Sequence, residues 1–171
     1  MSQARLGLFV FGLACLATAC TERMAPTAKA ARVEQMQCDH SPSGGGDVAV
    51  LQRATVLNAG PLYSHVITGK NGSEDRVTGA KLIVRAPEGV SAERLTRALQ
   101  CHSAQVLLGQ VDASRFADDP YWLPDAWLDI DVKPENGNFV VVVRADNVSD
   151  GLHVLHRATA FADTHPTMID P

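Results

Sequence analysis

The sequence predicts an α+β domain: a small antiparallel sheet in the order strand, strand, helix, strand, strand, helix, with both helices on one face. The prediction rests on two hairpins of alternating apolar and polar residues and on two amphipathic segments. A ferredoxin-like plait is the alternative, because strand, helix, two strands, helix makes up most of that pattern. The domain is expected over residues 47–162, with a disordered tail over residues 163–171.

The first hairpin is expected on either side of the segment KNGSED, which is typical of a turn. The segment before it, residues 48–61, fits either a helix ended by its Gly-Pro pair or a β-branched strand bent there, and the strand is favoured. After the turn, RVTGAKLIVRA alternates as a half-buried strand does, with Leu82 and Val84 on one face.

A helix is expected to follow, with Ser91 as its N-cap and Val90 packed on Leu95 as a hydrophobic staple. It should run to about Leu108 and end at Gly109. At about 100° per residue, one stripe of this helix is mainly apolar, with Cys101 at its margin. The residues of the stripe are Leu95, Ala98, Leu99, His102 and Val106.

The second hairpin gives the strongest local signal, because two alternating strands flank Asn136-Gly137, a dipeptide that favours a tight hairpin turn. Residues 139–143 are apolar on both faces, as expected of a central strand. A last helix, capped near Asn147 or Ser149, is predicted through DGLHVLHRATAFA.

The N-terminus has the pattern of an export signal. Arg5 precedes an uncharged apolar run over residues 6–16. This run is shorter than the roughly 18 residues that a membrane-spanning helix needs. We therefore expect residues 1–19 to be a cleaved signal peptide.

The segment LATAC resembles a bacterial lipobox, in which the cysteine is acylated and the chain is cut just before it. It departs from the commonest pattern in having Ala17 where leucine is most frequent. The resemblance implies lipidation of Cys20, with a palmitoyl chain among its acyl groups. Thr21 stands where an aspartate retains some lipoproteins in the inner membrane, so an outer-membrane anchor facing the periplasm is favoured. The alternative is an ordinary signal peptide cut after Ala19, which leaves Cys20 unmodified.

Residues 20–46 are small, polar and glycine-rich, ending in SPSGGG. Such a composition buries too little apolar surface to offset the entropy of ordering. The segment is therefore interpreted as a flexible tether.

Two cysteines remain once Cys15 has left with the signal and Cys20 carries lipid. In an oxidising periplasm, Cys38 and Cys101 are candidates for one disulfide. The alternative is that both stay reduced, one buried and one in the tether.

Composition narrows the classes of partner. Removal of the signal takes away Arg5 alone, so 14 of the 15 Lys and Arg remain against 19 Asp and Glu, a net charge of −5. Clustered cations for a nucleic-acid backbone are not evident, and no nucleic-acid partner is expected. The expected partners are the membrane, through the N-terminal lipid, and an envelope protein or glycan.

The segment TGAKLIVRAPEGVSAERLTRALQCHSAQ, followed by the second hairpin and a helix containing LHRA, is similar to a group of uncharacterised bacterial envelope lipoproteins. The resemblance covers about residues 61–160. Its most specific element is the pair Cys101-His102 in the helix after PEGVSAE. It implies the same fold and compartment and no particular activity.

Metal binding is the alternative function. His153 and His156 are three residues apart on the last helix, and His102 could approach them from the other helix. Such a set suits zinc or copper. The favoured interpretation is that His102 is a core residue and that no cofactor is bound.

The loop FADDPYWLPDAW offers a candidate binding surface built from Tyr121, Trp122 and Trp127. If the chain is a non-catalytic envelope lipoprotein that presents its domain for structure or interaction, the mature protein should be metal-free and Tyr121 or Trp122 should be exposed. Asp129 and Asp131 share a strand face and are interpreted as solvated rather than as an acid–base pair. With no catalytic motif found, the leading hypothesis is a non-catalytic envelope lipoprotein.

Overall fold

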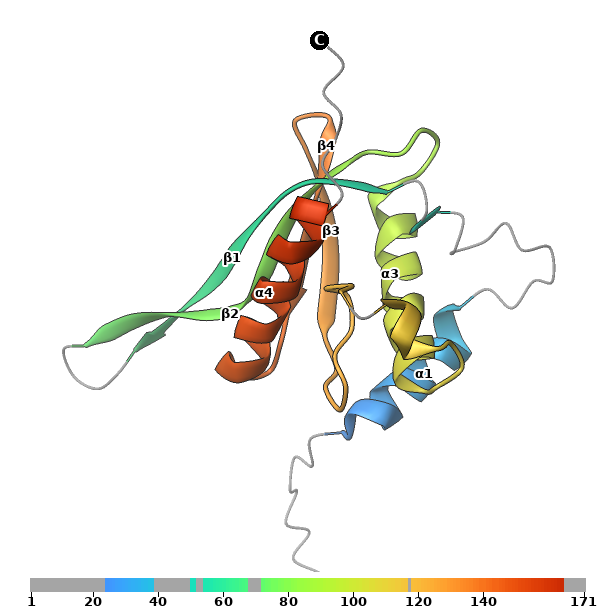
Figure 1. The fold of residues 1–171 in the computed structure, drawn as a ribbon, viewed down its shortest axis with the longest axis horizontal. Coiled ribbons are helices and arrows are strands. Elements are labelled where there is room, and N and C mark those ends of the chain that lie inside the picture. The colour runs from blue at the N-terminus through green and yellow to red at the C-terminus, as the bar shows by residue number, and fades with distance from the viewer. Residues whose placement is uncertain (1–23, 39–49, 52–53, 68–71, 117, 165–171) are drawn as a thin grey trace, which may run out of the picture.

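The computed structural model describes residues 24–38, 50–51, 54–67, 72–116 and 118–164. The expected signal peptide, the expected acylation site Cys20 and residues 165–171 of the predicted tail lie outside these ranges. The first two residues of that tail, Asp163 and Thr164, are instead the last residues of a helix. Within them the fold is α+β, as predicted, with a four-stranded sheet and helices packed on it (Figure 1).

The sheet has the strand order β1-β2-β4-β3, and every neighbouring pair is antiparallel. The strands are β1 (Thr55–Ile67), β2 (Ser73–Arg85), β3 (Asp129–Glu135) and β4 (Asn138–Arg144). Each hairpin keeps its two strands side by side, and β2 pairs with β4 to join the hairpins. A ferredoxin-like plait instead places a helix between its first two strands, so the primary prediction describes the sheet better.

Both predicted helices pack on the same face of the sheet. Helix α3 (Ala92–Leu107) lies against β3, and helix α4 (Val148–Thr164) lies against β2 and β1. The core between the layers is formed by residues from all four strands and both helices. Its fully buried large side chains include Leu82, Val84, Leu95, Leu99, Val141, Val143 and Val154. The other face of the sheet carries exposed charges such as Lys81 and Lys133.

The local signals for helix ends and turns are confirmed. Ser91 Oγ accepts a hydrogen bond from the Arg94 N–H at 3.2 Å, and Gly109 follows α3 with a φ of 70°. Asn147 Oδ1 caps α4 by accepting from the Asp150 N–H at 2.9 Å. Asn136 and Gly137 both have positive φ, as a tight hairpin turn requires.

The first hairpin is longer than the sheet. β4 pairs with β2 only from Gly79 to Arg85, so residues 73–77 pair with β1 alone. The hairpin therefore projects beyond the sheet as a two-stranded arm, formed by residues 63–67 and 73–77 (Figure 1). Tyr63 and Ile67 are among its exposed side chains.

The predicted tether over residues 20–46 is wrong in its middle part. Residues Pro26–Gln37 form helix α1, which packs against α3. The helix begins with Pro26 in its first turn and contains several alanines, which have the highest helix propensity. Its contact with α3 uses the buried side chain of Ala30, which lies with Ala104 and Trp127 in a small second core.

Candidate functional site

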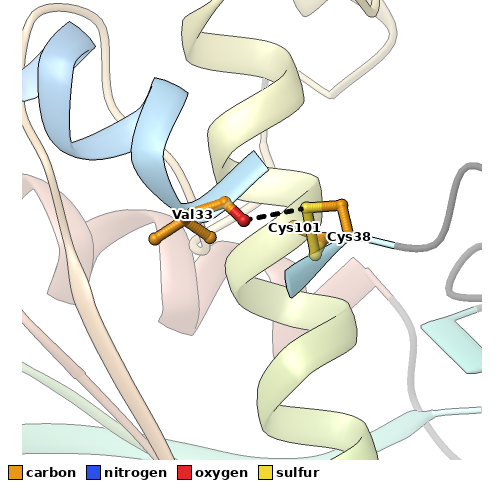
Figure 2. Close-up of a disulfide and its surroundings, with 3 residues drawn as sticks. All are labelled: Val33, Cys38 and Cys101. Atoms are coloured by element: carbon orange, nitrogen blue, oxygen red, sulfur yellow. Dashed lines mark hydrogen bonds between the residues drawn. A yellow bond between two sulfur atoms is a disulfide. The ribbon is translucent and has the colours of Figure 1, made fainter. Parts of the chain in front are cut away.

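The Cys38–Cys101 disulfide is present, as predicted, and fastens α1 across α3 (Figure 2). Cys38 is the C-cap residue of α1, and its Cα lies 5.4 Å from the Cα of Cys101. The Val33 carbonyl oxygen is 3.7 Å from Cys38 Sγ, a packing contact because a disulfide sulfur carries no proton. In this state Cys101 has no thiolate to offer as a nucleophile.

His102, the next residue on α3, forms a buried pair with Asp119. Its Nε2 donates to Asp119 Oδ2 at 2.5 Å, and both side chains are about nine-tenths buried. The other carboxylate oxygen of Asp119 accepts from the Tyr121 backbone N–H at 2.7 Å. The interpretation of His102 as a core residue is confirmed, with a carboxylate as the partner of its ring.

The loop that carries Asp119 also contacts α4, and so links the two helices. Arg157 of α4 donates from Nη1 to the carbonyl oxygens of Trp122 at 2.9 Å and Asp119 at 3.4 Å. Its guanidinium carbon also lies 4.9 Å from the centre of the Trp122 ring, a cation–π distance. Tyr121 meets Phe161 of α4 edge to face, with ring centres 6.4 Å apart. The site is therefore a polar network between α3 and α4, in which a loop carboxylate holds the histidine.

The three predicted metal ligands do not converge. His102 is buried against Asp119, whereas His153 and His156 lie on the exposed side of α4. Among the described residues, no three His, Cys, Asp or Glu side chains are grouped so that they could hold a metal ion. Asp119 contacts both His102 of α3 and Arg157 of α4, whereas His153 and His156 are exposed.

The expectation that Tyr121 or Trp122 is exposed is wrong. Tyr121 and Trp122 are each 8% exposed, and Trp127 is 9% exposed. Tyr121 belongs to the main core, and Trp127 packs beneath α1, where its Nε1 donates to Asp129 Oδ1 at 3.2 Å. The aromatic side chains of this loop therefore help to close the fold instead of presenting a stacking surface.

A separate cleft of about 520 Å³ lies between α1, α3 and β3. It is lined by Met36, Gln37, Glu93, Thr96, Arg97, Gln100, Asp131 and Val132. Its charged groups have mixed sign and lie on the surface, and Gln100 Nε2 donates to the Ile130 carbonyl oxygen of β3 at 2.9 Å. The one hydroxyl in this lining, on Thr96, donates to the Ala92 carbonyl oxygen of α3 at 3.0 Å.

Asp119 and Arg157 are the two site residues that the sequence analysis missed. The only local signal was the pair of aspartates before Pro120 and two aromatic residues. Nothing in that segment distinguishes Asp119, which is buried, from Asp118, which is exposed.

Burial, and to a smaller extent the Asp119 carboxylate, raises the pKa of Tyr121 well above its usual value near 10. The folded protein therefore holds this proton more tightly than the unfolded chain does. The free energy of unfolding should be unaffected by Tyr121 below pH 10 and should fall above it, by about 1.4 kcal/mol per pH unit. Urea unfolding of the wild type and Tyr121→Phe at several alkaline pH values measures this slope, which should be shallower in the variant. Equal slopes would contradict the assignment.

No protein-family model, curated protein or solved structure matches the chain. Among the helices in the described ranges, none has both the length and the apolar character needed to cross a bilayer.

Proposed function

We propose that the protein is a lipid-anchored lipoprotein of the bacterial cell envelope whose domain acts as a non-catalytic structural or interaction module. The anchor is Cys20, and the domain faces the periplasm from the outer membrane. Its partners beyond the membrane are an envelope protein or a glycan.

The observation that supports this proposal is the Cys38–Cys101 disulfide. Structural disulfides persist in oxidising compartments and are rare in a reducing cytoplasm. The bond therefore agrees with the export signal of residues 1–19, which was inferred from independent residues. It accounts for Cys38 and Cys101, the two cysteines that follow Cys20 in the sequence.

The site supports a non-catalytic role. The polar network of His102, Asp119 and Arg157 is directed inward and joins α3 to α4 through a loop. A dyad of Cys101 and His102 would need a free thiolate, and the sulfur is bonded to Cys38. The resemblance to envelope lipoproteins noted for residues 61–160 bears on the fold and the compartment and implies no particular activity.

Metabolic labelling with radioactive palmitate in a bacterial host tests the anchor. The full chain should incorporate label, and Cys20→Ser should lose it. Cys15→Ser is the matched control, because it removes a cysteine of the same signal region and should keep the label. Mass spectrometry that finds Met1 intact, or a mature chain without acyl groups on Cys20, would overturn the proposal.

A further inference from the structure

The N-terminal end of α1 lies at one end of the domain, beside the start of α4. Lys29 Nζ in the first turn of α1 is 3.7 Å from Asp146 Oδ2, in the junction between β4 and α4. From this end, α1 runs along the C-terminal half of α3. Its C-cap residue, Cys38, is bonded to Cys101. We call the end formed by Met24, Lys29, Asp146, Val148 and Leu152 the anchor end. The turn between β3 and β4 lies at the opposite end (Figure 1).

The proposed acylation site is close to this end along the chain. Only residues 21–25 separate Cys20 from the start of α1 at Pro26. At about 3.5 Å per residue, the six Cα–Cα steps from Cys20 to Pro26 span no more than about 21 Å in any conformation. A domain of this size has a radius of gyration of about 14 Å, which corresponds to a diameter of about 37 Å for a sphere. The linker is therefore too short for the opposite end of the domain to turn towards the same bilayer.

Of the large apolar side chains that are exposed in the described ranges, Met24, Val148 and Leu152 belong to the anchor end, whereas Met36 lies near the end of α1 and Tyr63 and Ile67 lie on the arm. Met24 is 45% exposed, Val148 37% and Leu152 49%. On a short linker, such side chains meet the lipid at an effective concentration in the millimolar range. The charges there are mixed, with Lys29 paired to Asp146 and Asp150 hydrogen-bonded by Asn147. This end therefore has no net attraction for anionic lipid, and zwitterionic headgroups suit it.

We infer that the anchor end rests on the lipid surface, with Met24, Val148 and Leu152 in contact with the headgroup region. The inference depends on the proposed lipidation of Cys20. It adds an orientation to that proposal: the opposite end, with Glu88 and Glu135, points away from the membrane and is free to meet a partner. The Cys38–Cys101 disulfide maintains this orientation because it keeps α1 folded onto the domain.

The test uses the full acylated protein, purified from bacterial membranes in detergent and reconstituted into phosphatidylethanolamine vesicles with a minor fraction of phosphatidylglycerol. A fluorophore is attached to Leu152→Cys at the anchor end or to Glu88→Cys at the opposite end, and quenching by lipids with a spin label on the headgroup is measured. Both positions are exposed, and under non-reducing conditions the native cysteines are bonded or acylated and do not react. Glu135→Cys serves as a second distant position.

We expect the fluorophore at position 152 to be quenched several-fold more than the fluorophore at position 88 or 135. Equal quenching in protein that is acylated and sediments with the vesicles would overturn the orientation and leave the anchor intact. Protein that lacks acyl groups and stays in solution would instead overturn the proposed function. A flexible insert of about twenty residues after Arg23 should remove most of the difference, since it lengthens the reach of the chain. An undiminished difference would overturn the role assigned to the short linker.

Discussion

Replacing both Cys38 and Cys101 with serine is expected to lower the free energy of unfolding by about 4 kcal/mol, the chain-entropy value for a loop of this length. The two cysteines are 63 residues apart, and the loop between them contains both long strands of the first hairpin. Removal of the bond therefore restores conformational freedom to a large part of the unfolded chain. Urea unfolding of the oxidised wild type and of the double variant measures the difference.

The same variant should loosen α1 before the rest of the domain unfolds, because the helix contributes little apolar surface beyond Ala30. Trp127 lies beneath α1 and reports this step. In a Trp122→Phe background, in which Trp127 is the only tryptophan, its fluorescence should shift towards that of an exposed indole when the cysteines are replaced. If the double cysteine variant had the same urea unfolding midpoint and the same Trp127 fluorescence spectrum as the oxidised protein, the disulfide would not be what holds α1 on the domain.

Asp119→Ala is expected to lower the free energy of unfolding by about 2–6 kcal/mol, because it leaves two buried donors without their acceptor, at about 1–3 kcal/mol each. The change takes away the acceptor that Asp119 supplies to His102 and to the Tyr121 backbone N–H. Both donors are buried, so water does not easily replace the lost carboxylate. Thermal and urea unfolding measure the loss.

Asp118→Ala is the matched control, since it removes the same side chain from the preceding, exposed position. Its effect should stay within about 0.5 kcal/mol. Asp119→Asn, which keeps the shape and one acceptor oxygen, should fall between the two. If the Asp119→Ala and Asp118→Ala variants had the same free energy of unfolding, the network between α3 and α4 would not contribute to the stability of the fold.

The sheet and the two helices on it could be predicted because their signals are local. The Asn136-Gly137 turn, the Ser91 cap and Gly109 each act within a few residues, and the structure uses all three. Of the segment before KNGSED, for which a strand is favoured over a helix, the part from Thr55 onward is β1, which continues through Gly60 and Pro61, whereas Val50 and Leu51 are helical. Alternation with period two in β2 then indicated which of its side chains enter the core, and the unbroken apolar run of β4 indicated a central strand.

Helix α1 was missed because its stability depends on distant residues. Its sequence is only weakly amphipathic, and one side chain, Ala30, is fully buried. An isolated helix of twelve residues is marginal in water, so packing on α3 and the bond from Cys38 must supply the rest. Pro26 at the helix start and the alanines after it were the available signals.

The site was only half predictable for the same reason. A histidine on the apolar stripe of α3 pointed to a core position for His102, and its burial is confirmed. Which carboxylate meets it depends on how the loop of residues 110–128 folds back between two helices, and no periodicity encodes that path. Trp127 is part of the binding surface expected from sequence, but α1, which the tether prediction did not include, covers it.

The projecting arm of the first hairpin has two open edges, where backbone amides and carbonyls could accept a strand from another copy. Its side chains oppose such pairing. His65 Nδ1 lies 2.9 Å from Asp75 Oδ1, and Arg76 Nη2 lies 3.1 Å from Glu74 Oε2, so charged and polar groups line the exposed ribbon. Charges along an edge strand disfavour sheet-to-sheet addition. The two ion pairs of the arm therefore disfavour the addition of a strand from a second copy, whereas Tyr63 and Ile67 are the exposed apolar side chains on the same ribbon.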